Sequence, residues 1–160
     1  MWPLPSIATR ADIVALQRTM LPLATPMPAP LHFWLPGYYV RVLTLPKDSL
    51  VVGKIHRHAH DLCVLSGHAL VLDPEWHEVY GGSHFRSEAG AKRAVYCYED
   101  TTFMTIHKNP SGTRDLAAIE AEHILPEDAE TAALMAEFTQ RSTHDLGCTG
   151  RDSSQRRKRS

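Results

Sequence analysis

Apolar and polar residues alternate through the middle of the chain, a pattern that predicts β-strands with one buried face. Aromatic and β-branched residues are concentrated at 38–45, directly after the turn-forming pair Pro36-Gly37. Strands are predicted at 38–45, 50–58, 61–72 with an interruption at Ser66-Gly67, 78–80, 84–87, 93–98 and 102–107. Turns every 8 to 12 residues or so, without helices between them, indicate a sandwich or a barrel.

The hydrophobic period becomes helical near both ends of the chain. Residues 9–20 predict a short helix, with Thr9 as its N-cap and Asp12 as the capping partner. Four prolines then indicate an extended linker. Two further helices are predicted at 116–122 and 126–140. The expected organisation is an N-terminal helix and linker (1–30), a barrel (31–110), C-terminal helices (111–140) and a basic disordered tail (141–160).

The chain has 160 residues, of which 43% are hydrophobic, and this composition is typical of a globular protein. Its net charge is −1. This charge gives no bias toward nucleic acid, apart from weak contacts expected of the basic tail. Three widely spaced cysteines without a CxxC pair favour a reducing compartment. No apolar run approaches the roughly 18 residues that span a bilayer. We therefore expect a cytosolic protein that does not enter a membrane.

Three histidines, His56, His58 and His60, occupy every second position after a run of apolar residues. On a strand they share one face, where neutral imidazoles can bind a divalent transition metal such as Zn, Fe, Mn, Ni or Cu. The alternative is a polar strand whose histidines bond to one another, to water or to neighbouring strands. His107 or His84 can complete a metal site if barrel closure brings their strands nearby, and each can equally be a strand-end histidine.

These residues resemble the first motif of the cupin superfamily, which runs glycine, spacer, His-x-His, short gap, glutamate, six residues, glycine. The chain has Gly53, then His56-Arg57-His58, then Gly67, with His60 at the glutamate position. The second motif, Pro-x-Gly-x-x-His, resembles 88–93, where Arg93 takes the place of the ligand histidine. The resemblance implies a mainly β fold, a cupin-type double-stranded β-helix or jelly-roll barrel, with one short N-terminal and two C-terminal helices.

The wider pattern over residues 30–122 is similar to small cupin-like proteins encoded by bacteriophages and prophages. This similarity implies the fold and a phage setting, either in a host cytosol or associated with a virion, with no reaction to carry over. The first hypothesis, from the histidines and the cupin motifs, is a barrel that binds a metal ion through His56, His58, His60 and His107, or a small anionic molecule. The alternative is a non-catalytic phage-associated structural or interaction protein that uses the barrel as a scaffold. Its partners would be a second copy of the chain or virion proteins.

An arginine at a metal-ligand position suggests anion binding, because a guanidinium repels a metal ion and forms a bidentate fork with carboxylate or phosphate. Arg93 is therefore a candidate ligand-binding residue, and the alternative is an ion pair with Glu88 or Glu99. His32 is a second candidate that would line the barrel mouth, unless it packs against Phe33 and Trp34.

Overall fold

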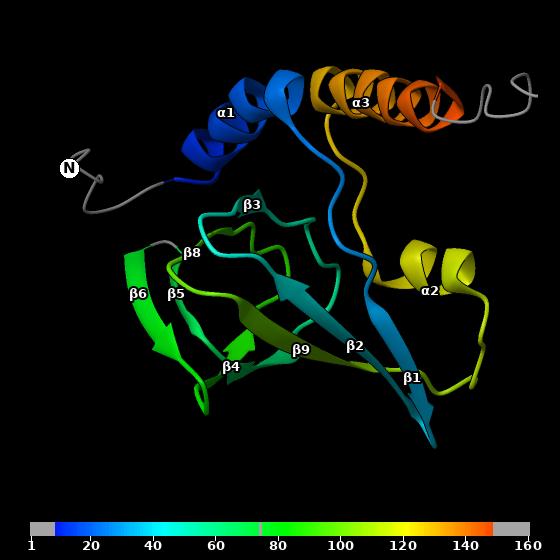
Figure 1. Ribbon diagram of the computed structural model, residues 1–160. Helices are drawn as coiled ribbons and strands as arrows, with labels where there is room; N and C mark the ends of the chain where they lie inside the picture. The colour runs from blue at the N-terminus through cyan, green and yellow to red at the C-terminus, as the bar shows by residue number, and fades with distance from the viewer. Residues whose placement is uncertain (1–8, 74, 149–160) are drawn as a thin grey trace, which may run out of the picture.

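The computed structural model describes residues 9–73 and 75–148, in which a helix precedes a set of strands and two helices follow them (Figure 1). The elements are α1 Arg10–Met20, η1 Leu21–Leu23, β1 Leu31–Leu35, β2 Tyr38–Leu45, β3 Leu50–Val52, β4 His60–Ser66, β5 His68–Asp73, β6 Glu75–Tyr80, β7 His84–Ser87, β8 Ala94–Cys97, β9 Thr101–Lys108, α2 Leu116–His123 and α3 Ala129–Cys148.

The strands form two antiparallel sheets, ordered β1-β2-β9-β4-β7 and β3-β8-β5-β6. The hydrogen-bonded pairs β2–β9, β3–β8, β4–β7 and β5–β6 join the first strand of this set to the last, the second to the next-to-last, and so on inward. This nested pairing of eight strands in two sheets is that of a jelly roll. The predicted fold class is confirmed, including the short N-terminal helix and the two C-terminal helices.

The core lies between the sheets, where alternate residues of each strand meet. Leu43 and Leu45 of β2 pack there with Val64, Val71 and Phe103, all of them buried. The alternation in β2 therefore places its odd-numbered positions on the inner face of the five-stranded sheet.

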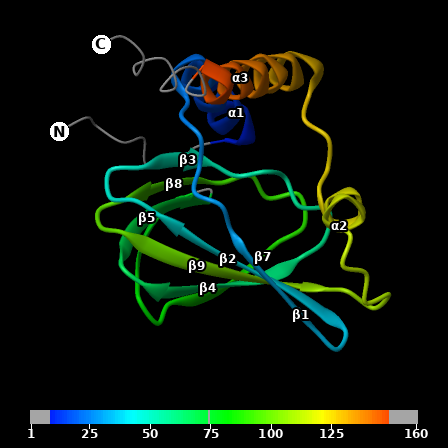
Figure 2. The ribbon, with the colours of Figure 1, turned by 45° about the vertical axis from the view of Figure 1, so that its right-hand side comes forward.

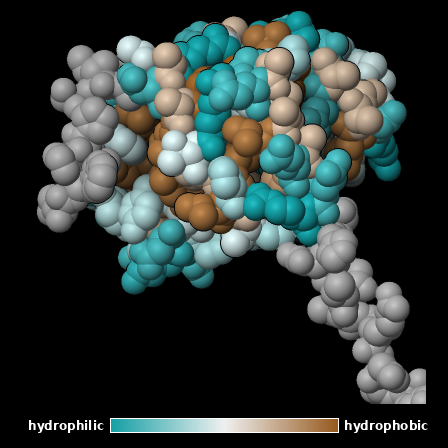
Figure 3. All heavy atoms as spheres, turned by 90° about the horizontal axis from the view of Figure 1, so that it is seen from above, coloured by the Kyte–Doolittle hydropathy of each residue, from teal (hydrophilic) through white to brown (hydrophobic). Residues whose placement is uncertain are grey.

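The helix α1 covers the outer face of the four-stranded sheet, where Ile13 is buried against Leu72 and Ala94. Its N-terminus has the predicted capping box, in which Thr9 accepts from the backbone of Asp12 and the Asp12 side chain accepts from the backbone of Thr9. The helix α3 lies beside α1 above the sheets (Figures 1 and 2). On the face seen from the helix side, apolar groups are interspersed among hydrophilic ones (Figure 3).

Arg18 joins the two helices through Thr131 at 3.1 Å and Asp128 at 2.8 Å. The helix α3 begins three residues later than predicted and continues to Cys148. Part of the predicted disordered tail, residues 141–148, is thus helical, and Arg141 donates to the carbonyls of Leu21 and Pro22. The rest of the predicted tail lies outside the described residues.

The sequence prediction missed β1, and it differs from the structure again at residues 50–58, close to the candidate site. The strand ends at Val52, because the following backbone bonds to partners outside the sheets. Gly53 donates to the carbonyl of Arg93, the carbonyl of Ile55 accepts from Leu125, and Arg57 donates to the carbonyl of His123. We call residues 53–59 the histidine loop. None of the helices in the described ranges has the length and apolar character needed to cross a membrane.

Candidate metal centre

His56 is held in the histidine loop by backbone contacts on two sides. It forms an isolated antiparallel bridge with Ile124, and its carbonyl accepts from Gly90 at 2.8 Å. The segment after α2 and the turn before β8 therefore fix the position of this side chain. A residue held by its backbone on both sides loses little further freedom when it binds a ligand.

His60 begins β4 and His107 lies near the end of β9. The two strands pair antiparallel with Asp61 opposite Ile106, so the histidines are neighbours at the end of this strand pair. Their ring centroids lie 4.6 Å apart. Both side chains point to the inner face of the five-stranded sheet and are buried, at 3% and 6% exposure.

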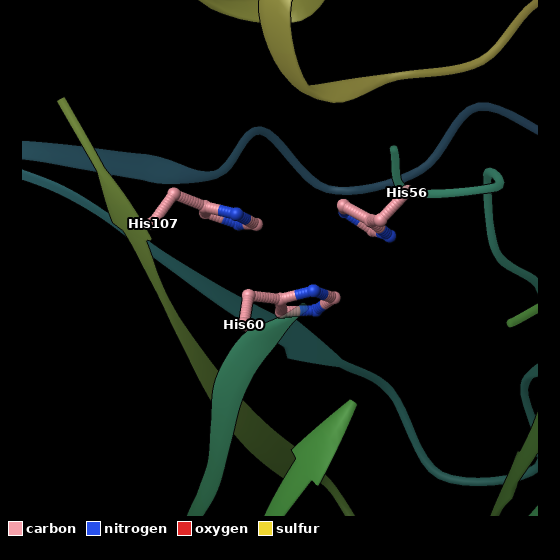
Figure 4. A group of neighbouring side chains, drawn as sticks. All are labelled: His56, His60 and His107. Atoms are coloured by element: carbon pink, nitrogen blue, oxygen red, sulfur yellow. The ribbon is translucent and has the colours of Figure 1, made fainter. Parts of the chain in front are cut away.

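The histidine loop brings His56 to this pair, and the three side chains converge (Figure 4). The centroid of the His56 ring lies 4.1 Å from that of His60 and 5.3 Å from that of His107. One ring nitrogen from each residue can be chosen so that all three lie within 4.8 Å of one another. We call these three residues the histidine trio.

The trio is held in its neutral form. Burial, followed by the charges of His60 and Arg93, lowers the pKa of His56 to about 3. Burial also lowers the pKa of His107 to about 3, with His60 and His56 contributing. For His60, burial outweighs a backbone hydrogen bond at His58 and lowers the pKa to about 4. Neutral imidazoles have the lone pairs that metal ions bind.

One observation tests whether these residues fit a metal ion. The Nδ1 atom of His60 is buried and has no hydrogen-bond partner in the described part of the chain. A buried polar atom without a partner is costly, and a bound ion is one way to satisfy it. An all-imidazole donor set suits Zn, Fe, Ni or Cu and admits Mn, so the donor chemistry fits a divalent transition metal.

His58 lies apart from the trio, unlike the sequence prediction. Its side chain is 52% exposed and its Nε2 atom lies 3.5 Å from the carboxylate of Glu122. The prediction assumed a regular strand, on which alternate side chains share a face. The histidine loop is irregular, so the alternation does not hold there. His84 also lies outside, 58% exposed and 3.4 Å from Asp61.

His123 is a neighbour of the trio that sequence reasoning missed. It ends α2, is buried at 7% exposure, and its ring centroid lies 5.0 Å from that of His107. Burial, then the charge of His58, lowers its pKa. The only signal in the sequence was a histidine at a helix C-terminus, a position that the helix dipole also explains.

Arg93 has a different partner from those considered in the sequence. Its guanidinium pairs with Asp73 and also donates to the hydroxyl of Ser87, and it lies over the ring of Phe85. Asp73 follows Leu72 of β5, which pairs with Ala94 of β8, so the strand register brings the two charges together. The predicted pairs with Glu88 or Glu99 do not form. The charge of Arg93 is therefore neutralised within the protein.

His32 lies on β1 with its Nδ1 atom 2.7 Å from the hydroxyl of Tyr39. Its ring stacks on that of Tyr39 at 5.9 Å, and the Tyr39 ring stacks on that of His107 at 6.0 Å. His32 is thus linked to the trio through one tyrosine. Two grooves lie elsewhere, beside α1 and α3, and neither is lined by a residue of the trio.

No protein-family model matches this chain, and no curated protein matches it. The solved structures to which it is similar include a cupin-2 domain protein from Shewanella frigidimarina, at 12% identity over 57% of this chain and 90% of that one, with a TM-score of 0.45. A cupin protein from Bacteroides fragilis is 21% identical over 57% and 85%, with a TM-score of 0.43. KdgF from Halomonas is 14% identical over 55% and 81%, with a TM-score of 0.46. The fold assignment itself rests on the strand order, which is that of a jelly roll.

Proposed function

We propose that this protein is a cupin-type metalloprotein that binds one divalent transition-metal ion at His56, His60 and His107. The observation that carries the proposal is the convergence of three ring nitrogens, one from each neutral histidine, within 4.8 Å of one another. They lie at the inner face of the five-stranded sheet. The unpartnered Nδ1 of His60 supports it. His56 and His60 are close in the sequence, but His107 comes from a distant strand, and the pairing of β4 with β9 brings it to them.

A bound ion of this kind supplies Lewis acidity and, in some metals, redox chemistry. The protein's own contribution would be to hold three neutral donors in a mostly buried site and to leave the remaining positions free for water or a ligand. The surroundings of the trio are largely aromatic, with Tyr39 and His123 beside His107.

Elemental analysis of the purified full chain tests this proposal. We expect about one transition-metal ion per chain, because three histidines form one donor set. The double variant His56→Ala with His60→Ala should lose the metal, and so should His107→Ala. The matched control is His84→Ala, which removes an exposed histidine of a neighbouring strand and should keep full occupancy.

A result of full occupancy in the double variant would place the ligands elsewhere and overturn the proposal. Metal-free wild-type protein that also fails to take up added Zn²⁺, Fe²⁺, Mn²⁺ or Ni²⁺ would overturn it too. His58→Ala is a second useful control. The exposed position of His58 gives no reason for it to affect metal content.

A second candidate function is that of an interaction protein, which the edge strand β1 favours. Leu31, Phe33 and Leu35 alternate along β1 and are 61%, 47% and 56% exposed. We propose a second copy of the chain as the partner, because an apolar edge strand can pair antiparallel with itself about a two-fold axis. Light scattering should then show a dimer for the wild type and a monomer for Phe33→Ser. A monomeric wild type would exclude this pairing.

We also propose association with a phage or virion, which rests on the resemblance described above, and a cytosolic location, which rests on the widely spaced cysteines. Purified virions or infected cells probed with an antibody against the chain would test them directly.

A further inference from the structure

Arg41 is a cation on the inner face of the barrel, next to the histidine trio. It lies on β2 between Tyr39 and Leu43, which are both buried on the inner face. The strand register places Arg41 opposite His32 of β1 and opposite Thr105 of β9. On the same pair of strands, Tyr39 lies opposite His107. Arg41 and His107 are therefore diagonal neighbours on one face, a relationship that spans about 7–8 Å between backbones.

The guanidinium of Arg41 has no partner. Within residues 9–73 and 75–148 it makes no hydrogen bond, ion pair or ring contact, although it is half-buried. Arg93 differs in this respect, because Asp73 neutralises it. The positive charge of Arg41 is felt by the trio, where it contributes to the lowered pKa of both His56 and His107.

A second unsatisfied group lies beside this cation. The hydroxyl oxygen of Thr105 is buried and has no hydrogen-bond partner in the described part of the chain. It is opposite Arg41 across the β2–β9 pair. An unpaired guanidinium and an unpaired hydroxyl on one inner face lower stability unless something binds them. Groups that are costly in the free protein and that converge on one place are typical of a ligand site.

We propose that Arg41 and Thr105 anchor the carboxylate of a small organic acid whose other end reaches the metal ion. This inference rests on the proposed metal site and names the class of ligand that it takes. The planar guanidinium forms a two-pronged pair with a carboxylate, and the Thr105 hydroxyl donates a further hydrogen bond. The short diagonal between Arg41 and His107 limits the ligand to a few carbon atoms, as in 2-oxo acids and short dicarboxylates.

The test is isothermal titration of pyruvate, malonate and succinate into the metal-loaded full chain at fixed ionic strength. We expect at least one of them to bind the wild type and to bind Arg41→Gln at least tenfold more weakly. The matched control is Arg86→Gln, which removes a charge of the same kind from the outer face of the same sheet, where Arg86 lies 3.7 Å from Asp61. This control should bind the acids within twofold of the wild type. Methyl pyruvate, which lacks the carboxylate, should not bind.

Thermal unfolding of the ligand-free proteins separates a ligand anchor from a structural residue. If Arg41 serves a ligand, Arg41→Gln should unfold at the wild-type temperature or above it, because it removes an unpaired charge. A structural role would lower the unfolding temperature. Arg41→Lys keeps the charge without the fork, and we expect it to bind the acids more weakly than the wild type while remaining folded.

Three outcomes would overturn the inference: equal binding by wild type and Arg41→Gln, binding of methyl pyruvate as tight as that of pyruvate, or no binding of any acid. Metal content is measured in the same samples. Protein that takes up no metal but still binds an acid through Arg41 would refute the proposed function and the contact between acid and metal, and would leave only the carboxylate anchor at Arg41 standing. Metal-loaded protein that binds no acid would support the proposed function and refute this inference.

Discussion

Lys92 and Glu127 form a buried ion pair that ties the segment after α2 to the histidine loop. The Nζ atom of Lys92 lies 2.8 Å from Oε1 of Glu127, and the two side chains are 0% and 9% exposed. The same Nζ atom donates to the carbonyl of Gly53, the first residue of the histidine loop, at 3.3 Å. The pair therefore connects the C-terminal part of the chain to the backbone that carries His56.

The variant Glu127→Gln should lower the free energy of unfolding by about 3 to 5 kcal/mol, because it leaves the buried Lys92 charge without its counter-ion. It should also weaken metal binding, since the histidine loop loses a support. Urea unfolding and metal titration measure the two effects. The control Glu130→Gln removes a 66% exposed carboxylate that pairs with Arg18, and should cost less than about 1 kcal/mol. Equal stabilities for the two variants would contradict this role.

The metal-free protein should lose stability in acid because of the trio. The folded-state pKa values, about 3 for His56 and His107 and about 4 for His60, lie below the unfolded value of about 6.5. Between these values the unfolded chain binds more protons, so stability is full above pH 6.5 or so and falls as the pH decreases toward 3–4. Each histidine contributes at most about 1.4 kcal/mol per pH unit.

Urea unfolding of the chelator-treated protein from pH 8 to pH 4 checks this dependence. His107→Gln should give a shallower loss of stability than the wild type, because one titrating group is removed. His84→Gln, which removes an exposed histidine outside the trio, is the matched control against which the slope of His107→Gln is compared. If the stability of the wild type stayed constant down to pH 4, protonation of the trio would not be a cause of acid unfolding.

Gly67, between β4 and β5, should not tolerate alanine. Its φ is +94°, and an added Cβ would lie 2.4 Å from the carbonyl oxygen of Asp100 and 2.7 Å from Cα of Thr101. Strain in this region of φ costs about 1–2 kcal/mol, and the backbone clash adds to it. Gly82→Ala provides the control, because φ there is +95° but nothing lies within 4 Å. Thermal unfolding should show a distinctly larger loss for Gly67→Ala, and equal losses would rule out the clash.

Arg93→Met should be destabilising without affecting the response to anions. Removal of the guanidinium leaves Asp73, which is 28% exposed, without its partner, and we expect a loss of about 2–3 kcal/mol in unfolding free energy. Pyruvate at fixed ionic strength should shift the melting temperatures of the variant and the wild type equally. A response that disappears in Arg93→Met but persists in Arg41→Gln would assign the anion site to Arg93 after all.

Local pattern was sufficient for much of the fold. The alternation at 38–45 predicts β2 with its observed bounds, and the spacing of Thr9 and Asp12 predicts the capping box of α1. These features depend on neighbours two to four residues away, so they can be seen in the sequence. The candidate histidines were named on residue type and spacing, and three of those named, His56, His60 and His107, meet in the structure.

The make-up of the site was decided by contacts between distant segments. The backbone of 53–57 bonds to 90, 93 and 123–125 instead of continuing a strand, and this turns His58 outward while His56 meets His60. The strand register gives Arg93 the carboxylate of Asp73 and leaves Arg41 without a partner among the described residues, although both are arginines within strands or beside them. His123 approaches the trio only because α2 packs against the barrel. The sequence by itself determined which histidines and arginines were available to bind a metal ion or an anion. The sheet register and the loop contacts decided which of these side chains meet, and which arginine has a carboxylate partner among the described residues. Pairing over long sequence distances depends on the whole fold, so it could not be predicted from local pattern.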